Sequence, residues 1–234
     1  MNIALLGYGR MGKSIEAIAL TRNHSISLKI TDANDTYDFS TTDVAIDFSV
    51  PTAAVSNIKK ALDAGVPVIS GTTGWLEHYG DILEYCNSKN GTFLYASNFS
   101  LGVNIFFEIN KRLSELMGDF PEYAIDLEEI HHTKKLDAPS GTAITLAEQI
   151  IDNTNYKKWT LDKANADEIH IEAKRIPDVP GTHEITYNSE IDAISIKHTA
   201  HNRQGFAMGA VIAAEWIKDK KGVFTMKDVL QINV

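Results

Sequence analysis

Short apolar runs alternate with segments of helical periodicity along the first hundred residues of the chain. The apolar runs predict strands at residues 2–7, 25–32, 44–49, 66–70 and 92–97. The segments between them predict helices near residues 11–20, 52–64 and 75–87. Strands that alternate with helices in this way are typical of parallel sheets with right-handed crossovers. We therefore expect an α/β fold with a doubly wound, Rossmann-like parallel sheet.

A different pattern begins after residue 100. Residues 101–117 predict one long helix, and the strands that follow no longer alternate with helices. These predicted strands span residues 123–130, 168–176, 184–190 and 193–199, with a helix near residues 142–152. The last two strands are typical of a hairpin. Together they predict a second, α+β domain with a mixed or antiparallel sheet.

The end of the chain returns to a helical pattern. Residues 205–218 predict a helix, and residues 225–234 can add a last helix to either domain. We expect a first domain formed by residues 1–102 and 206–234, and a second formed by residues 103–205.

Composition narrows the class of protein. The 234 residues carry 22 Lys and Arg against 31 Asp and Glu, a net charge of −9, which disfavours nucleic acid and an anionic membrane surface as partners. Cys86 is the single cysteine, so an intrachain disulfide and a four-cysteine zinc site are excluded. The most apolar stretch, residues 206–217, contains Glu215 and is too short to span a bilayer, and no signal-peptide pattern is present. We expect a cytoplasmic protein.

A glycine-rich turn joins the first predicted strand to the first predicted helix. Its residues are Gly7, Tyr8, Gly9, Arg10, Met11 and Gly12, a G-x-G-x-x-G pattern. In dinucleotide-binding folds the first glycine permits the turn, the second lets the backbone approach a pyrophosphate, and the third lets helix and strand pack closely. The helix N-terminus then faces the phosphates. A tight turn without a ligand is the alternative for this pattern taken alone.

Asp32 ends the second predicted strand, where an acid can bind the ribose hydroxyls of a dinucleotide. An ordinary strand end is the alternative. Residues 33–43 contain no Lys or Arg and three aspartates. The 2′-phosphate of NADPH would find little positive charge there, which favours NADH. Arg10 and Lys13 lie near the phosphate turn in sequence and weaken this inference.

Two later strand ends carry small or polar residues. These are Gly71, Thr72 and Thr73 after the fourth strand, and Ala96, Ser97, Asn98 and Phe99 after the fifth. Ligands of open α/β sheets bind outside the carboxyl ends of the strands, so both loops can line a nicotinamide pocket. Turn formation alone is the alternative, because glycine and threonine are common in turns.

One segment of the second domain concentrates proton donors and positive charge. It contains His131, His132, Lys134 and Lys135. Imidazoles titrate near neutral pH and lysines neutralise carboxylates, so the segment suits an anionic substrate that must receive a proton. Ser140 predicts a helix N-cap beside the amides of Gly141 and Thr142, which can hold a carboxylate. Solvated histidines and an exposed lysine face are the alternatives.

A metal site is not expected in this segment. It lacks the His-Glu-x-x-His spacing, and no cysteine lies near it to supply a further ligand. His183, His198 and His201 can contribute ligands only if the fold brings them together from other strands.

Together these motifs resemble the dihydrodipicolinate reductase (4-hydroxy-tetrahydrodipicolinate reductase) family along the whole chain. The most specific motif runs from His131 to the Asp-Ala-Pro-Ser-Gly-Thr sequence at residues 137–142. Arg175, the Pro-Gly-x-His sequence at residues 180–183 and the closing segment 201–210 extend the likeness. The resemblance implies an NAD(P)H-dependent oxidoreductase of the diaminopimelate route to lysine. It also implies a homotetramer whose first domain binds the dinucleotide and whose second domain binds the substrate and forms the subunit contacts.

The resemblance implies a role for each matched residue. His131 is expected to be the catalytic proton donor and acceptor, and Lys135 a second proton donor. The residues expected to bind the substrate, a small dicarboxylate, are His132, Gly141 and Thr142. The expected cofactor contacts are Gly7 to Gly12, Asp32, Gly71 to Thr73 and Ala96 to Phe99.

The implied reaction is the reduction of 4-hydroxy-tetrahydrodipicolinate to tetrahydrodipicolinate by NADH or NADPH. Another two-domain NAD-dependent amino-acid or sugar dehydrogenase is the alternative among enzymes. A redox-sensing NADH-binding regulator would need a DNA-binding unit with a basic face, and the sequence contains none. The chain departs from the family in trimmed loops and in Asp32, where many members have Glu. The departure at Asp32 bears on the choice between the two cofactors.

Overall fold

The computed structural model describes residues 1–32, 35–202 and 204–232. The chain divides into two compact units, one formed by Met1–Asn104 with Gln204–Val234 and the other by Ile105–Arg203. Each unit has its own sheet and its own buried apolar core.

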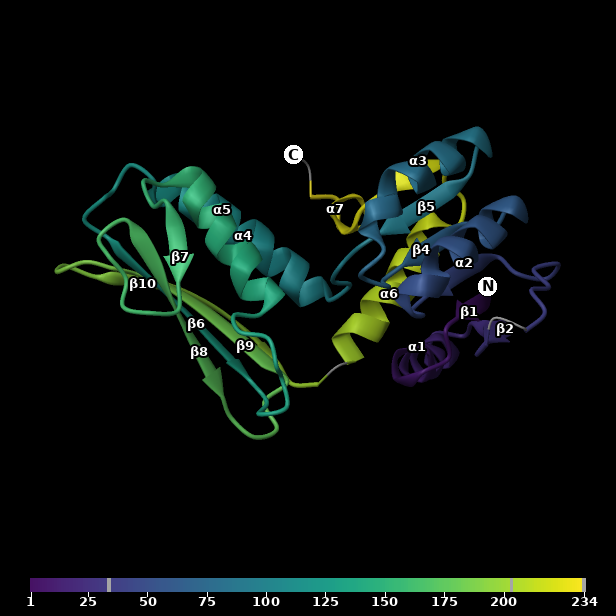
Figure 1. Ribbon diagram of the computed structural model, residues 1–234, viewed down its shortest axis with the longest axis horizontal. Coiled ribbons are helices and arrows are strands. Elements are labelled where there is room, and N and C mark those ends of the chain that lie inside the picture. The colour runs from purple at the N-terminus through teal and green to yellow at the C-terminus, as the bar shows by residue number, and fades with distance from the viewer. Residues whose placement is uncertain (33–34, 203, 233–234) are drawn as a thin grey trace. The chain divides into compact units, whose positions relative to one another are not determined.

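The first unit is built on a six-stranded sheet with the order β11-β5-β4-β3-β1-β2 (Figure 1). The strands are β1 (Asn2–Leu6), β2 (Ser25–Ile30), β3 (Val44–Asp47), β4 (Val68–Ser70), β5 (Thr92–Tyr95) and β11 (Gly222–Phe224). Every neighbouring pair is parallel. The strand order reverses between β1 and β3, and open α/β sheets bind ligands at the carboxyl ends of the strands at such a point.

Helices cover both faces of this sheet. They are α1 (Arg10–Thr21), α2 (Pro51–Asp63), α3 (Tyr79–Ser88), α6 (Gln204–Ile217) and the short α7 (Met226–Val229). On one face, Ile3 and Leu5 of β1 pack with α1 and α6, and on the other Ala4 and Leu6 pack with α2 and α3. Burial on both faces explains why β1 is a continuous apolar run. The predicted doubly wound sheet is confirmed.

The second unit contains a five-stranded mixed sheet with the order β10-β9-β6-β8-β7. The strands are β6 (Ala124–His131), β7 (Lys158–Thr160), β8 (Glu168–Arg175), β9 (Gly181–Asn188) and β10 (Ala193–Ala200). β6 pairs in parallel with β8 and antiparallel with β9, which forms the expected hairpin with β10. The predicted second α+β domain with a mixed sheet is confirmed.

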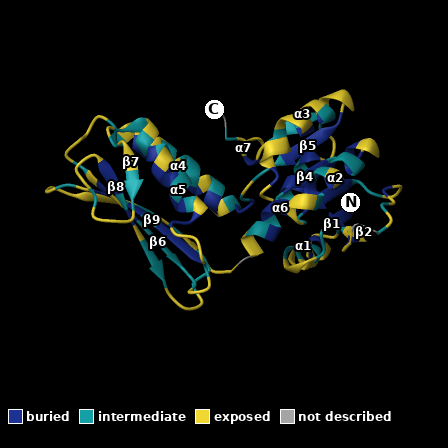
Figure 2. Cartoon of the chain, viewed as in Figure 1, coloured by how far each residue is buried: buried dark blue, intermediate teal, exposed yellow. Residues whose placement is uncertain are grey.

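Two helices, α4 (Leu101–Met117) and α5 (Gly141–Asn153), lie side by side over one face of this sheet (Figure 1). Residues of β6 alternate between burial under these helices, as at Ile125 and Leu127, and exposure, as at Asp126 (Figure 2). The same alternation places Glu129 on the buried face, on the same side of β6 as His131.

Several predicted elements differ from the structure. Strands β7 and β11 were not predicted, because three residues are too few for a periodic pattern to appear. The last predicted helix, residues 225–234, is wrong in length: α7 has four residues and belongs to the first unit. Thr225 and Asp228 form a capping box at its start, and Gln231 beyond it has φ +53°, outside the helical region. Among the described residues, no helix is both long and apolar enough to cross a membrane.

Candidate active site

The glycine turn lies between β1 and α1, at the switch point of the first sheet. Gly7 has φ +98°, and a Cβ there would lie 2.2 Å from the carbonyl oxygen of Phe48. A Cβ on Gly12 would lie 2.4 Å from the carbonyl oxygen of Gly7, so this glycine permits the close packing of α1. A Cβ on Gly9 would meet no atom within 4 Å, so the turn is open on that side. The first amides of α1 receive no side-chain cap, which leaves them for an anion.

A cavity of about 710 Å³ adjoins this turn within the first unit. Its wall includes Gly7, Tyr8, Gly9 and Asp32 among the expected cofactor contacts. The other lining residues come from the ends of β2 and β3, from Tyr37 in the segment between these strands, and from one side of α2. An open turn and an acid in one cavity, with the uncapped start of α1 directly following Gly9 on its wall, suit the pyrophosphate and ribose of a dinucleotide. The residues present therefore fit the cofactor that the sequence suggests.

Sequence reasoning missed Asp47, a buried carboxylate at the end of β3. Its oxygens accept hydrogen bonds from the side chains of Ser49 (2.7 Å), Asn57 (2.9 Å), Ser70 (2.8 Å) and Thr72 (2.7 Å). Burial raises the pKa of Asp47, and these hydrogen bonds oppose the rise. The carboxylate thereby ties the loop after β3 to the loop after β4. A polar residue at the end of an otherwise apolar strand was the signal available in the sequence.

The predicted contacts after β4 and β5 divide between buried and exposed positions. Gly71 lies against Phe48, since an added Cβ would come within 2.2 Å of that ring. Phe99 is buried, and its ring lies 5.5 Å from that of Phe48. Thr73 and Ser97 are exposed. Thr72 is buried and donates a hydrogen bond to Asp47, while Ala96 and Asn98 are half-buried. Of the predicted contacts near the glycine turn, Arg10 is exposed and Met11 is half-buried. None of the residues after β4 or β5 lines the 710 Å³ cavity.

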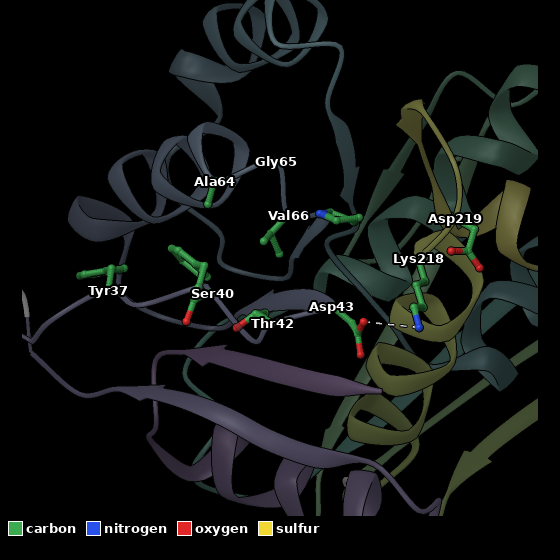
Figure 3. Close-up of a pocket in the computed structure, with 11 residues that line it drawn as sticks. Tyr37, Ser40, Thr42, Asp43, Ala64, Gly65, Val66, Lys218 and Asp219 are labelled. Atoms are coloured by element: carbon green, nitrogen blue, oxygen red, sulfur yellow. Dashed lines mark ion pairs between the residues drawn. The ribbon is translucent and has the colours of Figure 1, made fainter.

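A second cavity of the first unit, of about 560 Å³, lies at the opposite ends of the strands (Figure 3). Asp43 and Pro67 on its wall directly precede β3 and β4. The ammonium of Lys218 lies 3.4 Å from the carboxylate of Asp43, as the dashed line in Figure 3 marks. This cavity is at the amino ends of the strands, away from the glycine turn.

The second unit gathers five polar side chains around the end of β6. The carboxylate of Glu129, which is 0 % exposed, lies 3.0 Å from Nδ1 of His131. On the same carboxylate, Arg175 donates a hydrogen bond of 3.0 Å. The backbone N–H of Ser140 donates another, of 3.1 Å. Nε2 of His183 lies 3.0 Å from the Ser140 hydroxyl and 3.8 Å from the Glu129 carboxylate.

This environment fixes the charge of two of the groups. Burial raises the pKa of Glu129, but hydrogen bonds from His131, Ser140 and Arg175 outweigh it and lower the pKa to about 2. Burial, together with the charge of His131, lowers the pKa of His183 to about 3. At neutral pH the carboxylate is therefore ionised and the His183 imidazole is neutral.

The imidazole of His131 has a defined orientation. Its Nδ1 faces Glu129, and an ionised carboxylate there favours the tautomer with a proton on Nδ1. Its Nε2 lies beside Gly181, where an added Cβ would approach to 3.1 Å. The ring of His183 packs edge-on against it, with centroids 5.1 Å apart. A histidine held in this way can exchange a proton through Nε2.

The start of α5 adjoins this group. The Ser140 hydroxyl accepts a hydrogen bond of 3.2 Å from the N–H of Ala143, which confirms the predicted N-cap. Gly141 is exposed, and a Cβ there would meet no atom within 4 Å. Thr142 is half-buried. The predicted carboxylate-binding amides therefore lie at an open helix N-terminus.

Lys135 and His132 lie on the loop between β6 and α5. The Lys135 ammonium binds both carboxylate oxygens of Asp137, at 2.7 and 2.9 Å, and lowers the pKa of that acid. Arg175 also donates a hydrogen bond of 2.7 Å to the carbonyl of Asp137. His132 is half-buried and makes contacts of its own. Arg175 therefore connects this loop to Glu129.

Among the described residues, Glu129, His131 and His183 have potential ligand atoms within 4.8 Å of one another. Arg175 and the Ser140 amide already bind the Glu129 carboxylate, and a guanidinium at that distance repels a cation. His198 and His201 are not part of this group. The arrangement suits proton transfer better than metal binding.

Sequence reasoning did not single out Glu129, although the period of two along a strand places it on the same face as His131. Arg175 and His183 entered only through the family resemblance. Arg175 pairs with His131 across β6 and β8, and His183 pairs with Glu129 across β6 and β9. This register is not contained in any local motif.

Comparisons with known proteins identify the family of this chain. A family model for the N-terminus of dihydrodipicolinate reductase matches residues 1–99, and a model for its C-terminus matches residues 102–230. A 4-hydroxy-tetrahydrodipicolinate reductase of Christiangramia forsetii is 58% identical over 98% of this chain and 98% of that protein. One of Methanococcoides burtonii is 37% identical over 94% of this chain and 85% of that protein.

The solved structure of a dipicolinate-bound dihydrodipicolinate reductase from Paenisporosarcina sp. TG-14 matches with a TM-score of 0.77 at 21% identity. It covers 96% of this chain and 97% of that one, and the likeness shows a shared fold. Because family models match both halves and the relatives align over nearly the full length, this chain belongs to the dihydrodipicolinate reductase family.

Proposed function

We propose that this chain catalyses the NAD(P)H-dependent reduction of 4-hydroxy-tetrahydrodipicolinate to tetrahydrodipicolinate, in the diaminopimelate route of lysine biosynthesis. The relatives that carry this name align with almost every residue of the chain. The observation that carries the proposal is the buried Glu129 carboxylate 3.0 Å from His131, beside the open N-terminus of α5. That arrangement combines an oriented proton donor with a carboxylate-binding helix end.

The first unit, in this proposal, binds the dinucleotide. The pyrophosphate would lie against the glycine turn and the uncapped start of α1, and the adenosine ribose against Asp32. The loops at Gly71 to Thr73 and Ala96 to Phe99 would contact the nicotinamide end. When bound, NAD(P)H supplies the hydride that reduces C4 of the substrate, from which the hydroxyl group departs as water.

The second unit binds the dicarboxylate and moves the proton. The amides of Gly141 and Thr142 would hold one carboxylate, while His132 and the Lys135 ammonium bind and neutralise the substrate. His131 delivers a proton through Nε2 because Glu129 holds its Nδ1. Glu129 acts through His131 and is a positioning residue. Lys135 lies on the same loop and is proposed as a second proton donor.

Finer features belong to the same proposal. Asp32 favours NADH over NADPH, since it suits ribose hydroxyls and repels a phosphate. A homotetramer in the cytoplasm is proposed from the family resemblance. Exposed polar residues such as Asp126 and Ser195, on the sheet face away from α4 and α5, offer a surface for subunit contacts through the second unit.

A coupled assay tests the reaction. Aspartate semialdehyde, pyruvate and the synthase that precedes this step generate the substrate, and oxidation of NADH or NADPH is followed by absorbance. We expect turnover only when the synthase is present. Cofactor oxidation that does not depend on the synthase would contradict the proposal. So would a lack of oxidation in the complete assay together with activity toward an amino acid or a sugar. The second result would favour another two-domain dehydrogenase.

A further inference from the structure

Lys60 lies on the wall of the 710 Å³ cavity beside the glycine turn. Three of the residues that α2 presents to this cavity, Ala53, Asn57 and Lys60, follow the spacing of one helix face. Among the described lining residues, Lys60 is the one cation and Asp32 the one acid. The cavity therefore brings a positive and a negative side chain together from separate elements.

An aromatic ring holds the Lys60 ammonium at this wall. Nζ lies 3.5 Å from the centroid of the Tyr37 ring, well within cation–π range. The Tyr37 hydroxyl donates a hydrogen bond of 2.7 Å to Asn57, and Asn57 donates one of 2.9 Å to the buried Asp47. The ring is thus anchored to the sheet. A cation above a ring keeps its N–H groups available to a further acceptor.

Asp32 acts on the same region. It lines the cavity at the end of β2. Burial raises the pKa of the Tyr37 hydroxyl, and nearby carboxylates, Asp32 among them, raise it further. Tyr37 thus interacts with both charged groups: its hydroxyl is affected by the charge of Asp32, and its ring contacts the ammonium of Lys60.

NADH and NADPH differ only in the 2′-phosphate of NADPH, and Asp32 and Lys60 are expected to act differently on that phosphate. Asp32 can accept hydrogen bonds from the ribose hydroxyls of NADH but repels the phosphate that replaces one of those protons in NADPH. A 2′-phosphate needs a cation close to the ribose. Lys29 is already paired with Glu16 at 2.7 Å, and Arg10 and Lys13 do not line the cavity.

We propose that Lys60 is the binding site for the 2′-phosphate of NADPH, and that it lets a chain with Asp32 at the ribose position use NADPH as well as NADH. This inference rests on the proposed dinucleotide function. It deepens that function by assigning the phosphate-binding group to α2. Residues 33–43, which contain no Lys or Arg, do not supply this group.

Binding measurements test this assignment without relying on turnover. Isothermal titration calorimetry with the full chain compares NADPH with NADH, and adenosine 2′,5′-bisphosphate with adenosine 5′-monophosphate. The variants are Lys60→Gln and Lys60→Arg. The matched control is Lys59→Gln, because Lys59 has the same charge and is adjacent in sequence. Its Nζ lies 5.0 Å from the ring centroid of Tyr85, and it does not line the cavity.

We expect Lys60→Gln to weaken NADPH and the bisphosphate by about 10- to 100-fold, the effect of losing one charge-assisted hydrogen bond. Binding of NADH and the monophosphate should change less than about twofold, because neither has a 2′-phosphate. Lys60→Arg should retain most NADPH affinity, and Lys59→Gln should match the unsubstituted chain. Unfolding midpoints of all variants establish that each is folded.

Three results would overturn the inference. Equal weakening of NADH and NADPH in Lys60→Gln would place Lys60 at the shared adenosine moiety, and no weakening of either would remove it from the site. Equal effects of Lys59→Gln and Lys60→Gln would indicate only a general charge effect. The proposed function stands in these cases, because the unsubstituted chain still binds dinucleotide. An unsubstituted chain that binds neither cofactor would overturn both.

Discussion

Substitution of Glu129 by Gln tests how the second unit prepares His131 for proton transfer. Glutamine keeps the shape of the side chain, but one acceptor oxygen becomes a donor NH₂ group. Whichever way the amide turns, this group meets an N–H donor, either that of Arg175 or that of Ser140. The carboxylate charge beside His131 is also lost.

The cost to stability follows from the pKa of Glu129. Its folded-state value of about 2, against an ordinary 4.5, corresponds to about 3 kcal/mol of stability at neutral pH. Because the folded pKa is the lower one, this stability is present above pH 4.5 and is lost as the pH falls toward 2. Glutamine retains part of the hydrogen bonding, so we expect a loss of about 1–3 kcal/mol at neutral pH and a smaller difference in acid.

The effect on activity is separable from the effect on stability. A well-placed general acid contributes about 10²–10⁴ in rate, and loss of the group that orients it should cost about a hundredfold in kcat. The KM for the dinucleotide should not change, because the glycine turn and Asp32 belong to the first unit.

Glu128→Gln is the matched control. Glu128 adjoins Glu129 in sequence, lies on the opposite face of β6 and pairs with Lys174. Steady-state kinetics across pH and denaturant unfolding should be run on both variants at a temperature at which both are folded. If Glu129→Gln lost stability but matched Glu128→Gln in kcat, Glu129 would be structural only and the positioning role would be refuted.

Four further substitutions test other parts of the site. His131→Ala should lower kcat by about 10²–10⁴ in the coupled assay, and an unchanged kcat would reject it as the proton donor. Lys135→Ala should lower kcat and raise the substrate KM, whereas a normal KM would restrict Lys135 to proton transfer. Ser140→Ala should cost about 1 kcal/mol in denaturant unfolding through loss of the N-cap, and an unaltered midpoint would contradict the cap. Gly7→Ala should cost about 1–3 kcal/mol or more, because φ is +98° and a Cβ would overlap Phe48; a normal melting temperature would contradict this.

Local patterns in the sequence were sufficient for most of the fold. The long helix α4 has the predicted limits, Leu101–Met117, because its apolar period continues without interruption. The parallel strands β1 and β3 were found as apolar runs because both of their faces are buried. Strands β7 and β11 contain three residues each, and their pairing with β8 and β5 depends on the fold of distant segments.

Some residues of the candidate sites could be predicted from a local motif, and others depend on contacts between distant segments. His131, Lys135 and Ser140 lie within one short segment, so a motif was enough to find them. Lys60 could not be predicted in this role, because residues 33–43, which directly follow Asp32, contain no Lys or Arg and α2 comes later in the chain. The fold brings Lys60 of α2 into one cavity with Asp32 at the end of β2. Arg175 depends on the register of β6 and β8.

Two of the basic side chains at the second-unit site are already paired with acids of the same unit. The chain has a net charge of −9, and the segment with His131, His132, Lys134 and Lys135 supplies basic side chains that can face a dicarboxylate. In the folded unit, however, Arg175 is paired with Glu129 and Lys135 with Asp137. A substrate carboxylate that binds Lys135 must therefore compete with Asp137, which is exposed and able to move aside into water. The amides of Gly141 and Thr142, at the exposed start of α5, would not require an acid to be displaced. We therefore propose that they contribute most to carboxylate binding, and that Lys135 adds to it once Asp137 moves aside.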